Sequence, residues 1–158
     1  MEGDHRPAQG RAVGHSGKRG LGVAGLSPAA TIRIAAAAIV NRQGQMLLVR
    51  KAGTEIFMQP GRKIDPGETA CAALVRELRE ELGLETNEGA LRFLGRFSAP
   101  AANEPGHAVE AALYRLHHDG PVSAQAEIAE LAWYPGDLPR RARLAPLTRD
   151  HVIPAAGL

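Results

Sequence analysis

Hydrophobic residues recur with a period of two over residues 31–40, around Ile32, Ile34 and Ile39, and this alternation predicts a β-strand. Residues 41–44 (Asn-Arg-Gln-Gly) are typical of a turn, so residues 45–50 are predicted to form a second strand, paired with the first as a hairpin. Further strands are predicted over residues 91–98, 108–116 and 128–134. Residues 52–67 contain two proline-glycine turn signals, at 60–61 and 65–67, and are expected to be a loop.

The clearest helix is predicted over residues 68–82. Its apolar side chains fall within an arc of about 100° on a helical wheel, and they are Cys71, Leu74, Val75, Leu78 and Leu82. Gly83 follows directly and suits a left-handed helix cap. A second helix, interrupted by two prolines, is predicted over roughly residues 141–156. Strands on both sides of one strong helix predict a single α/β domain with a mixed sheet.

Charge separates the start of the chain from the rest. The 158 residues hold 19 Lys and Arg against 17 Asp and Glu, a net charge of +2. Residues 1–30 contain four basic and two acidic residues, so they carry that whole excess, and they are rich in glycine. We therefore expect a flexible, Gly-rich basic tail over residues 1–30, dispensable for activity, and a neutral domain over residues 31–158. Spaced cations without aromatic neighbours do not predict specific nucleic-acid binding.

The composition excludes several other classes of protein. A content of 44% hydrophobic residues is enough for a packed core. The single cysteine, Cys71, excludes an intrachain disulfide and a cysteine-based zinc site. No apolar run approaches the roughly 18 residues needed to span a bilayer, and the N-terminus lacks a secretory h-region. We expect a soluble cytoplasmic protein without a membrane partner, either a monomer or a homodimer.

Three glutamates share one face of the predicted helix. Glu77 lies three residues before Glu80 and four before Glu81, so their side chains are close enough to converge. Like charges so placed repel each other, whereas a hard divalent cation such as Mg²⁺ would make the cluster favourable, because it prefers oxygen ligands. The alternative is a solvated charged face on which Arg76 and Arg79 are the partners.

The surroundings of these glutamates resemble the signature of the Nudix hydrolase family, in its MutT-like, single-domain form. The family pattern is Gly, five residues, Glu, seven residues, Arg-Glu, an aliphatic residue, any residue, Glu-Glu, any residue, Gly and an aliphatic residue. This chain matches it with Glu68, Arg76-Glu77-Leu78, Glu80-Glu81 and Gly83-Leu84. The resemblance is anchored on residues 61–84 and implies a Nudix fold, with a mixed β-sheet sandwiched between helices, over about residues 31–155.

The chain departs from the pattern at one position, where Arg62 replaces the first glycine. Two interpretations remain open. If the position needs a positive φ, arginine would be strained there by about 1–2 kcal/mol. Alternatively, the guanidinium points into the site and contacts a substrate phosphate.

The resemblance also implies roles for individual residues. By position, Arg76, Glu77 and Glu80 would be catalytic, with Arg76 orienting the carboxylates and paired with Glu68. The metal, Mg²⁺ with Mn²⁺ as an alternative, would be bound by one backbone carbonyl and a set of carboxylates: Gly61, Glu77, Glu80, Glu81 and, from outside the motif, Glu127.

Substrate contacts are expected from the residues next to the motif and from a loop later in the chain: Arg62, Lys63, Asn103 and Glu104. The implied reaction is Mg²⁺-dependent hydrolysis of a pyrophosphate bond in a nucleoside triphosphate, by water attack on phosphorus. The products would be the monophosphate and pyrophosphate, and an oxidised deoxynucleotide is one candidate substrate. The alternatives are an ADP-sugar or dinucleoside polyphosphate hydrolase, and a non-catalytic module that senses nucleotides.

Overall fold

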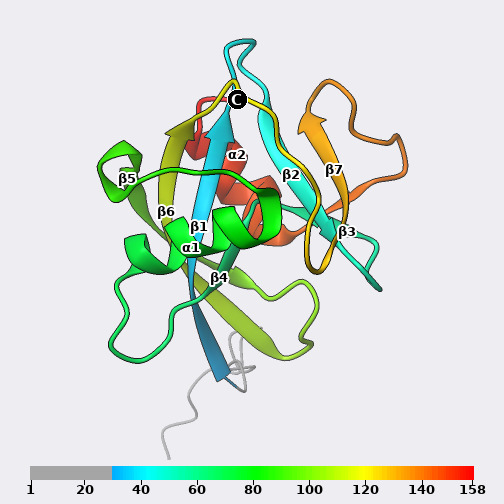
Figure 1. Cartoon of the computed structure of the whole chain (residues 1–158). Coiled ribbons are helices and arrows are strands. Elements are labelled where there is room, and N and C mark those ends of the chain that lie inside the picture. The colour runs from blue at the N-terminus through cyan, green and yellow to red at the C-terminus, as the bar shows by residue number, and fades with distance from the viewer. Residues whose placement is uncertain (1–29) are drawn as a thin grey trace, which may run out of the picture.

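The computed structural model describes residues 30–158. The predicted tail lies outside these residues, apart from Ala30, which begins the first strand. The chain folds as an eight-stranded mixed sheet with the path β5-β6-β1-β2-β3-β8, where β4 pairs with β1 and β7 with β2 (Figure 1). The strands are β1 (Ala30–Val40), β2 (Met46–Lys51), β3 (Ile56–Met58), β4 (Gly61–Lys63), β5 (Arg92–Pro100), β6 (His107–His117), β7 (Ile128–Tyr134) and β8 (Arg143–Leu144).

Helical segments cover both faces of this sheet. Helix α1 (Ala70–Leu82) lies on one side of β1, and a π-helical turn (Thr148–Val152) with α2 (Ile153–Ala155) lies on the other (Figure 1). Strand β1 therefore divides its side chains between two cores: Ala35, Ala37 and Ile39 pack towards α1, whereas Ala36, Ala38 and Val40 pack towards the C-terminal helical segment. The predicted sandwich of a mixed sheet between helices is confirmed.

Helix α1 starts and ends where its capping residues dictate. Thr69 has an extended backbone and its side-chain oxygen accepts a hydrogen bond from the Ala72 N–H at 3.1 Å, so the helix begins two residues later than predicted. Gly83 takes the left-handed conformation with φ 61°, and the Leu84 N–H donates to the Leu78 carbonyl at 3.1 Å. The predicted glycine cap is confirmed.

Two predictions of secondary structure are wrong. The segment expected to be a loop contains β3 and β4, and β4 pairs with β1 through Ile34↔Lys63. Three-residue strands are too short to show a hydrophobic period, so only their partners reveal them. The expected second helix begins only at residue 148, because Arg143 and Leu144 instead pair with β3.

The other predicted strands agree with the structure to within two residues, and β1 and β2 are paired as the expected hairpin. A short 3₁₀-helix (Glu88–Ala90) was not predicted. Within residues 30–158, no helix has the length and apolar character needed to cross a membrane.

Candidate active site

The predicted substrate-binding residues meet in one cleft of about 310 Å³. Strand β4, the loop after β5 and the turn before β7 contribute the predicted residues that line it: Gly61, Arg62, Lys63, Asn103, Glu104 and Glu127. The predicted metal ligands Glu77, Glu80 and Glu81 are not among the residues that line it. An apolar wall comes from Ile32, Ile34, Met58, Pro100, Val109 and Leu147. Residues far apart in sequence thus form one site that combines charged and apolar side chains, as is typical of a small-molecule pocket.

The three helix glutamates differ sharply in exposure. The side chain of Glu77 is 7% exposed, that of Glu80 is 50% exposed, and Glu81 lies between them. Burial, followed by the hydrogen bond and charge of Glu81, raises the pKa of Glu77 to about 8, although Arg62 and Lys51 oppose that rise. Crowded carboxylates of this kind favour either a proton or a cation.

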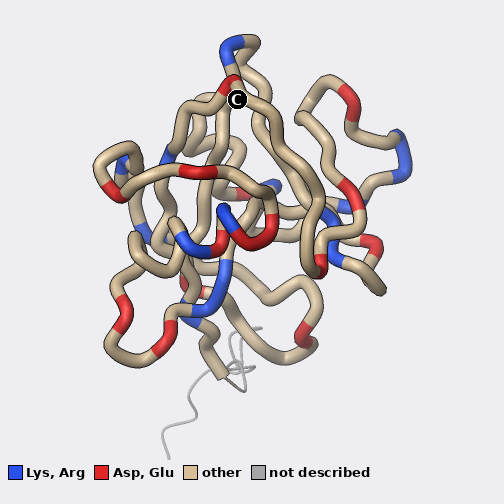
Figure 2. Tube along the Cα trace, viewed as in Figure 1, with Lys and Arg blue, Asp and Glu red and all other residues tan. Residues whose placement is uncertain are grey.

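Arg62 is the cation that the structure places beside them. Its guanidinium lies 3.6 Å from a Glu77 carboxylate oxygen, 3.7 Å from Glu80 and 3.5 Å from Asp65. Ala126 is the one non-glycine residue with a positive φ among residues 30–158, so Arg62 is not strained and that interpretation is wrong. Its contacts join β4 to α1, where acidic and basic positions alternate along the helix (Figure 2).

Arg76 does not contact the predicted metal-binding carboxylates, and this corrects its expected role. Its guanidinium lies 2.5 Å from Glu68, which confirms the predicted ion pair, and 3.3 Å from Asp65. Helical side chains lean towards the N-terminus of their helix, which brings Arg76 to the turn before α1 and away from Glu80. Arg76 therefore anchors the entry into α1, and Asp65 links it to Arg62.

Gly61 is required by the close approach of two strands. A Cβ atom added there would lie 2.7 Å from the Ala35 carbonyl oxygen of β1, closer than real contacts allow. The glycine thus allows β4 to lie against β1, which places Arg62 over α1. The expected contact of the Gly61 carbonyl with a metal stays a prediction.

The donor set fits a hard divalent cation in kind, because it consists of carboxylate oxygens that crowd around a largely buried Glu77. Within residues 30–158, however, no three acidic, histidine or cysteine side chains converge closely enough to hold a metal ion. The guanidinium of Arg62 lies against two of the three predicted ligands instead. A cation at this place would be held by Glu77, Glu80 and Glu81 after a rearrangement of side chains, and Glu127, which lines the cleft, stays a predicted further ligand.

Sequence reasoning missed a buried polar pair at the edge of the cleft. The Thr148 hydroxyl donates a hydrogen bond to the Gln59 side-chain oxygen at 2.6 Å, and both residues are buried. Gln59 also lines the cleft, so its side-chain amide is within reach of a ligand bound there. The only local signal for this pair is that Gln59 is a polar residue beside the apolar Met58. Its partner, Thr148, is 89 positions away in sequence, so no local pattern indicates the pair. A backbone feature was missed as well: Ala126 has a φ of 51°, directly before Glu127.

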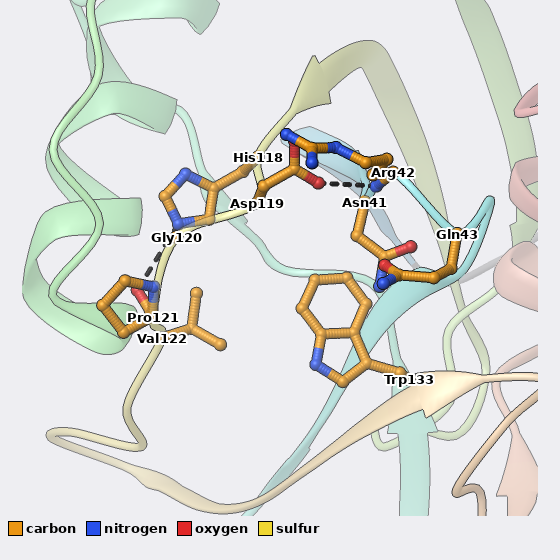
Figure 3. A pocket seen from close by; sticks show the side chains of 9 residues that line it. All are labelled: Asn41, Arg42, Gln43, His118, Asp119, Gly120, Pro121, Val122 and Trp133. Atoms are coloured by element: carbon orange, nitrogen blue, oxygen red, sulfur yellow. Dashed lines mark hydrogen bonds and ion pairs between the residues drawn. The ribbon is translucent and has the colours of Figure 1, made fainter.

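A second hollow, of about 520 Å³, is less suited to a ligand. It lies at the β1–β2 turn, where Trp133 faces Arg42 and the 118–122 segment (Figure 3). Asp119 already accepts the Arg42 backbone N–H at 2.6 Å and pairs with His117, and Asn41 is bonded to Gln45. Since these polar groups are engaged with one another, the cleft at β4 is the better candidate site.

The pKa of Glu77 predicts a pH dependence of stability. Between about pH 4.5 and 8 the unfolded carboxyl is ionised while the folded one stays protonated, so stability should fall as the pH rises through this window. In EDTA, thermal melts from pH 5 to 8 should show a steeper fall for the wild type than for Glu77→Gln. Parallel melting curves for the two proteins would contradict the assignment.

Comparison with known proteins agrees with this geometry. The family model described as NUDIX domain matches residues 31–155. An RNA pyrophosphohydrolase of Serratia proteamaculans is 48% identical over 50 residues, which are 32% of this chain and 29% of that protein. A CTP pyrophosphohydrolase of Escherichia coli is 42% identical over 57 residues, which are 34% of this chain and 42% of that protein. These matches therefore span less than half of either relative.

A solved structure extends the similarity over the domain. The MutT NUDIX hydrolase from Burkholderia pseudomallei is 28% identical, with a TM-score of 0.61, and the alignment covers 80% of this chain and 96% of that one. The family model, the mixed sheet between helices and the glutamate face of α1 lead to the same conclusion: the chain belongs to the NUDIX domain family.

Proposed function

We propose that the protein is a Mg²⁺-dependent hydrolase that cleaves a pyrophosphate bond in a nucleoside triphosphate, giving the monophosphate and pyrophosphate. The observation that carries this proposal is the cleft, which Arg62 and Lys63 line together with aliphatic side chains, while the Arg62 guanidinium also contacts Glu77 and Glu80 of α1. The two named relatives act, by their names, on RNA and CTP pyrophosphate bonds, which supports the chemistry and leaves the substrate open.

The residues divide the work by their positions. Arg62 and Lys63 line the cleft and would bind substrate phosphates, and Asn103 and Glu104, which also line it, would contact the sugar or base. Glu77, Glu80 and Glu81 would hold the metal, and one of them would accept the proton of the attacking water. A bound divalent cation supplies charge stabilisation at phosphate oxygens and a more acidic water. Glu127, directly before β7, would add a further carboxylate.

The apolar side chains that line the cleft favour a nucleotide base over a second charged group. They are aliphatic, and the tryptophan lines the other hollow, so the base would be held between aliphatic residues. An oxidised deoxynucleotide is one candidate within this class. The retained carboxylates and the cleft favour catalysis over a purely sensing module.

A substrate panel tests the proposal. The protein is incubated with Mg²⁺ and four substrate types: nucleoside triphosphates including an oxidised dGTP, ADP-ribose, diadenosine tetraphosphate and a 5′-triphosphorylated RNA oligonucleotide. The proposal expects pyrophosphate and monophosphate from at least one triphosphate. Turnover of the sugar-linked or dinucleoside substrates alone would favour the alternative, and binding without turnover would indicate a sensing module.

Gln59 is proposed as a substrate contact, and two matched variants separate that role from a structural one. Gln59→Met removes the amide from the cleft, whereas Thr148→Val breaks the same 2.6 Å hydrogen bond and keeps the amide. Loss of one neutral hydrogen bond to substrate predicts a KM about 3–10-fold higher for Gln59→Met with kcat little changed. An equal rise in KM for Thr148→Val would show that the pair is only structural.

A further inference from the structure

Arg62 stands where the family pattern has glycine, and its surroundings give it a task that the glycine cannot perform. We propose that the Arg62 guanidinium is a built-in counterion of the α1 carboxylates, which a divalent cation must displace to bind. This proposal rests on the proposed metal-dependent function.

The contacts of Arg62 carry the first step of this inference. One terminal nitrogen lies within 3.7 Å of both Glu77 and Glu80, and the other lies 3.5 Å from Asp65. The Arg62 side chain is only 23% exposed and that of Glu77 is 7% exposed, so this contact is shielded from solvent more than a surface ion pair. A shielded pair is screened less by water and salt and interacts more strongly.

The backbone carries the second step. Because Gly61 lies against Ala35, β4 is held close beside β1. Arg62 is the register partner of Ala35, whose side chain packs towards α1. The Arg62 Nε also donates to the Lys63 carbonyl at 3.3 Å. The guanidinium is thus supplied by a short strand that is held in place, whereas neighbouring Lys63 is exposed.

Charge balance gives the third step. A guanidinium and a divalent cation both require the carboxylates of Glu77 and Glu80, so the two compete for the same oxygens. Binding of the metal releases Arg62 towards the cleft that it already lines, where a substrate phosphate would meet it. In the absence of substrate, this site should therefore bind the metal more weakly than the same site without Arg62 would.

Binding of Mn²⁺ without substrate tests this directly, since free Mn²⁺ is counted by its electron paramagnetic resonance signal. Four full-length proteins are compared: wild type, Arg62→Ala, Arg62→Lys and Lys63→Ala. Arg62→Ala should bind Mn²⁺ about tenfold more tightly or better. Lys63→Ala, which removes the same charge one residue away, should change the affinity less than about threefold. Arg62→Lys should stay close to wild type.

Thermal melting gives a second readout. In EDTA at pH 7.5, Arg62→Ala should melt a few degrees below the wild type, because Glu80 and the ionised fraction of Glu77 lose their counterion. Saturating Mn²⁺ in the absence of EDTA should close that gap. Equal Mn²⁺ affinities for Arg62→Ala and Lys63→Ala would overturn the proposal and leave the metal-dependent function intact. No Mn²⁺ binding by any of the four proteins at millimolar concentrations would overturn both.

Discussion

Replacement of Glu81 by glutamine is expected to lower kcat by about 10²–10⁴-fold, while the protein stays folded. Glu81 lies on the same helical face as Glu77 and Glu80, but the ion pairs of this cluster involve those two residues rather than Glu81. The substitution therefore removes a carboxylate from the predicted metal site without breaking an observed ion pair. It also removes the Glu81 hydrogen bond and charge, which raise the pKa of Glu77 in addition to burial.

Steady-state kinetics with the substrate identified in the panel, together with a thermal melt, check this prediction. Glu85→Gln is the matched control, because Glu85 is exposed and lies just beyond the end of α1. The control should retain turnover within about twofold, since it removes a solvated charge. Undiminished turnover by Glu81→Gln would remove Glu81 from the metal site and leave Glu127 as the stronger candidate.

Replacement of Leu78 by alanine is expected to reduce the free energy of unfolding by about 2–5 kcal/mol. Leu78 is completely buried and belongs to the core between α1 and the sheet, where Ala35 and Ala37 of β1 lie opposite. Alanine side chains are too short to fill the space that the leucine leaves, so a cavity should remain. The same helix carries the glutamates, and activity should fall in parallel at temperatures near the melting point.

Urea unfolding followed by circular dichroism measures this loss. Arg79→Ala is the matched control, since it also shortens a long side chain on α1 but from an exposed position, and it should change the unfolding free energy by less than about 0.5 kcal/mol. A cost below about 1 kcal/mol for Leu78→Ala would mean that the α1 face of the sheet is not the tightly packed core described here.

The long elements could be predicted from sequence because their signals are local. Helix α1 has an apolar stripe and a glycine cap, and β7 has the bounds that its hydrophobic run indicates. The short strands could not be predicted, because β3, β4 and β8 exist only through pairing with distant partners. The predicted second helix is interrupted at Pro146, whereas the helical segment of the structure begins only after that residue, at Thr148.

The same distinction holds for the candidate site. Glu77, Glu80 and Glu81 follow from helical spacing, and the family pattern then marks the residues around them. The position of Arg62 depends on the pairing of β4 with β1, and the Gln59–Thr148 pair joins residues 89 positions apart. Such contacts are set by the tertiary fold, so no local pattern could indicate them. Arg76 likewise pairs with Glu68 and Asp65, and not with the predicted metal ligands, because the turn before α1 brings these two residues next to it.

The central claim, hydrolysis of a pyrophosphate bond by water attack on phosphorus, is tested most directly by turnover of the best triphosphate with Mg²⁺ in ¹⁸O-labelled water. Mass spectrometry of the products shows where the label enters. The account predicts nucleoside monophosphate and pyrophosphate, with one ¹⁸O bound to phosphorus in one of the two products and none in the sugar. Release of single inorganic phosphates, or products without label on phosphorus, would contradict it.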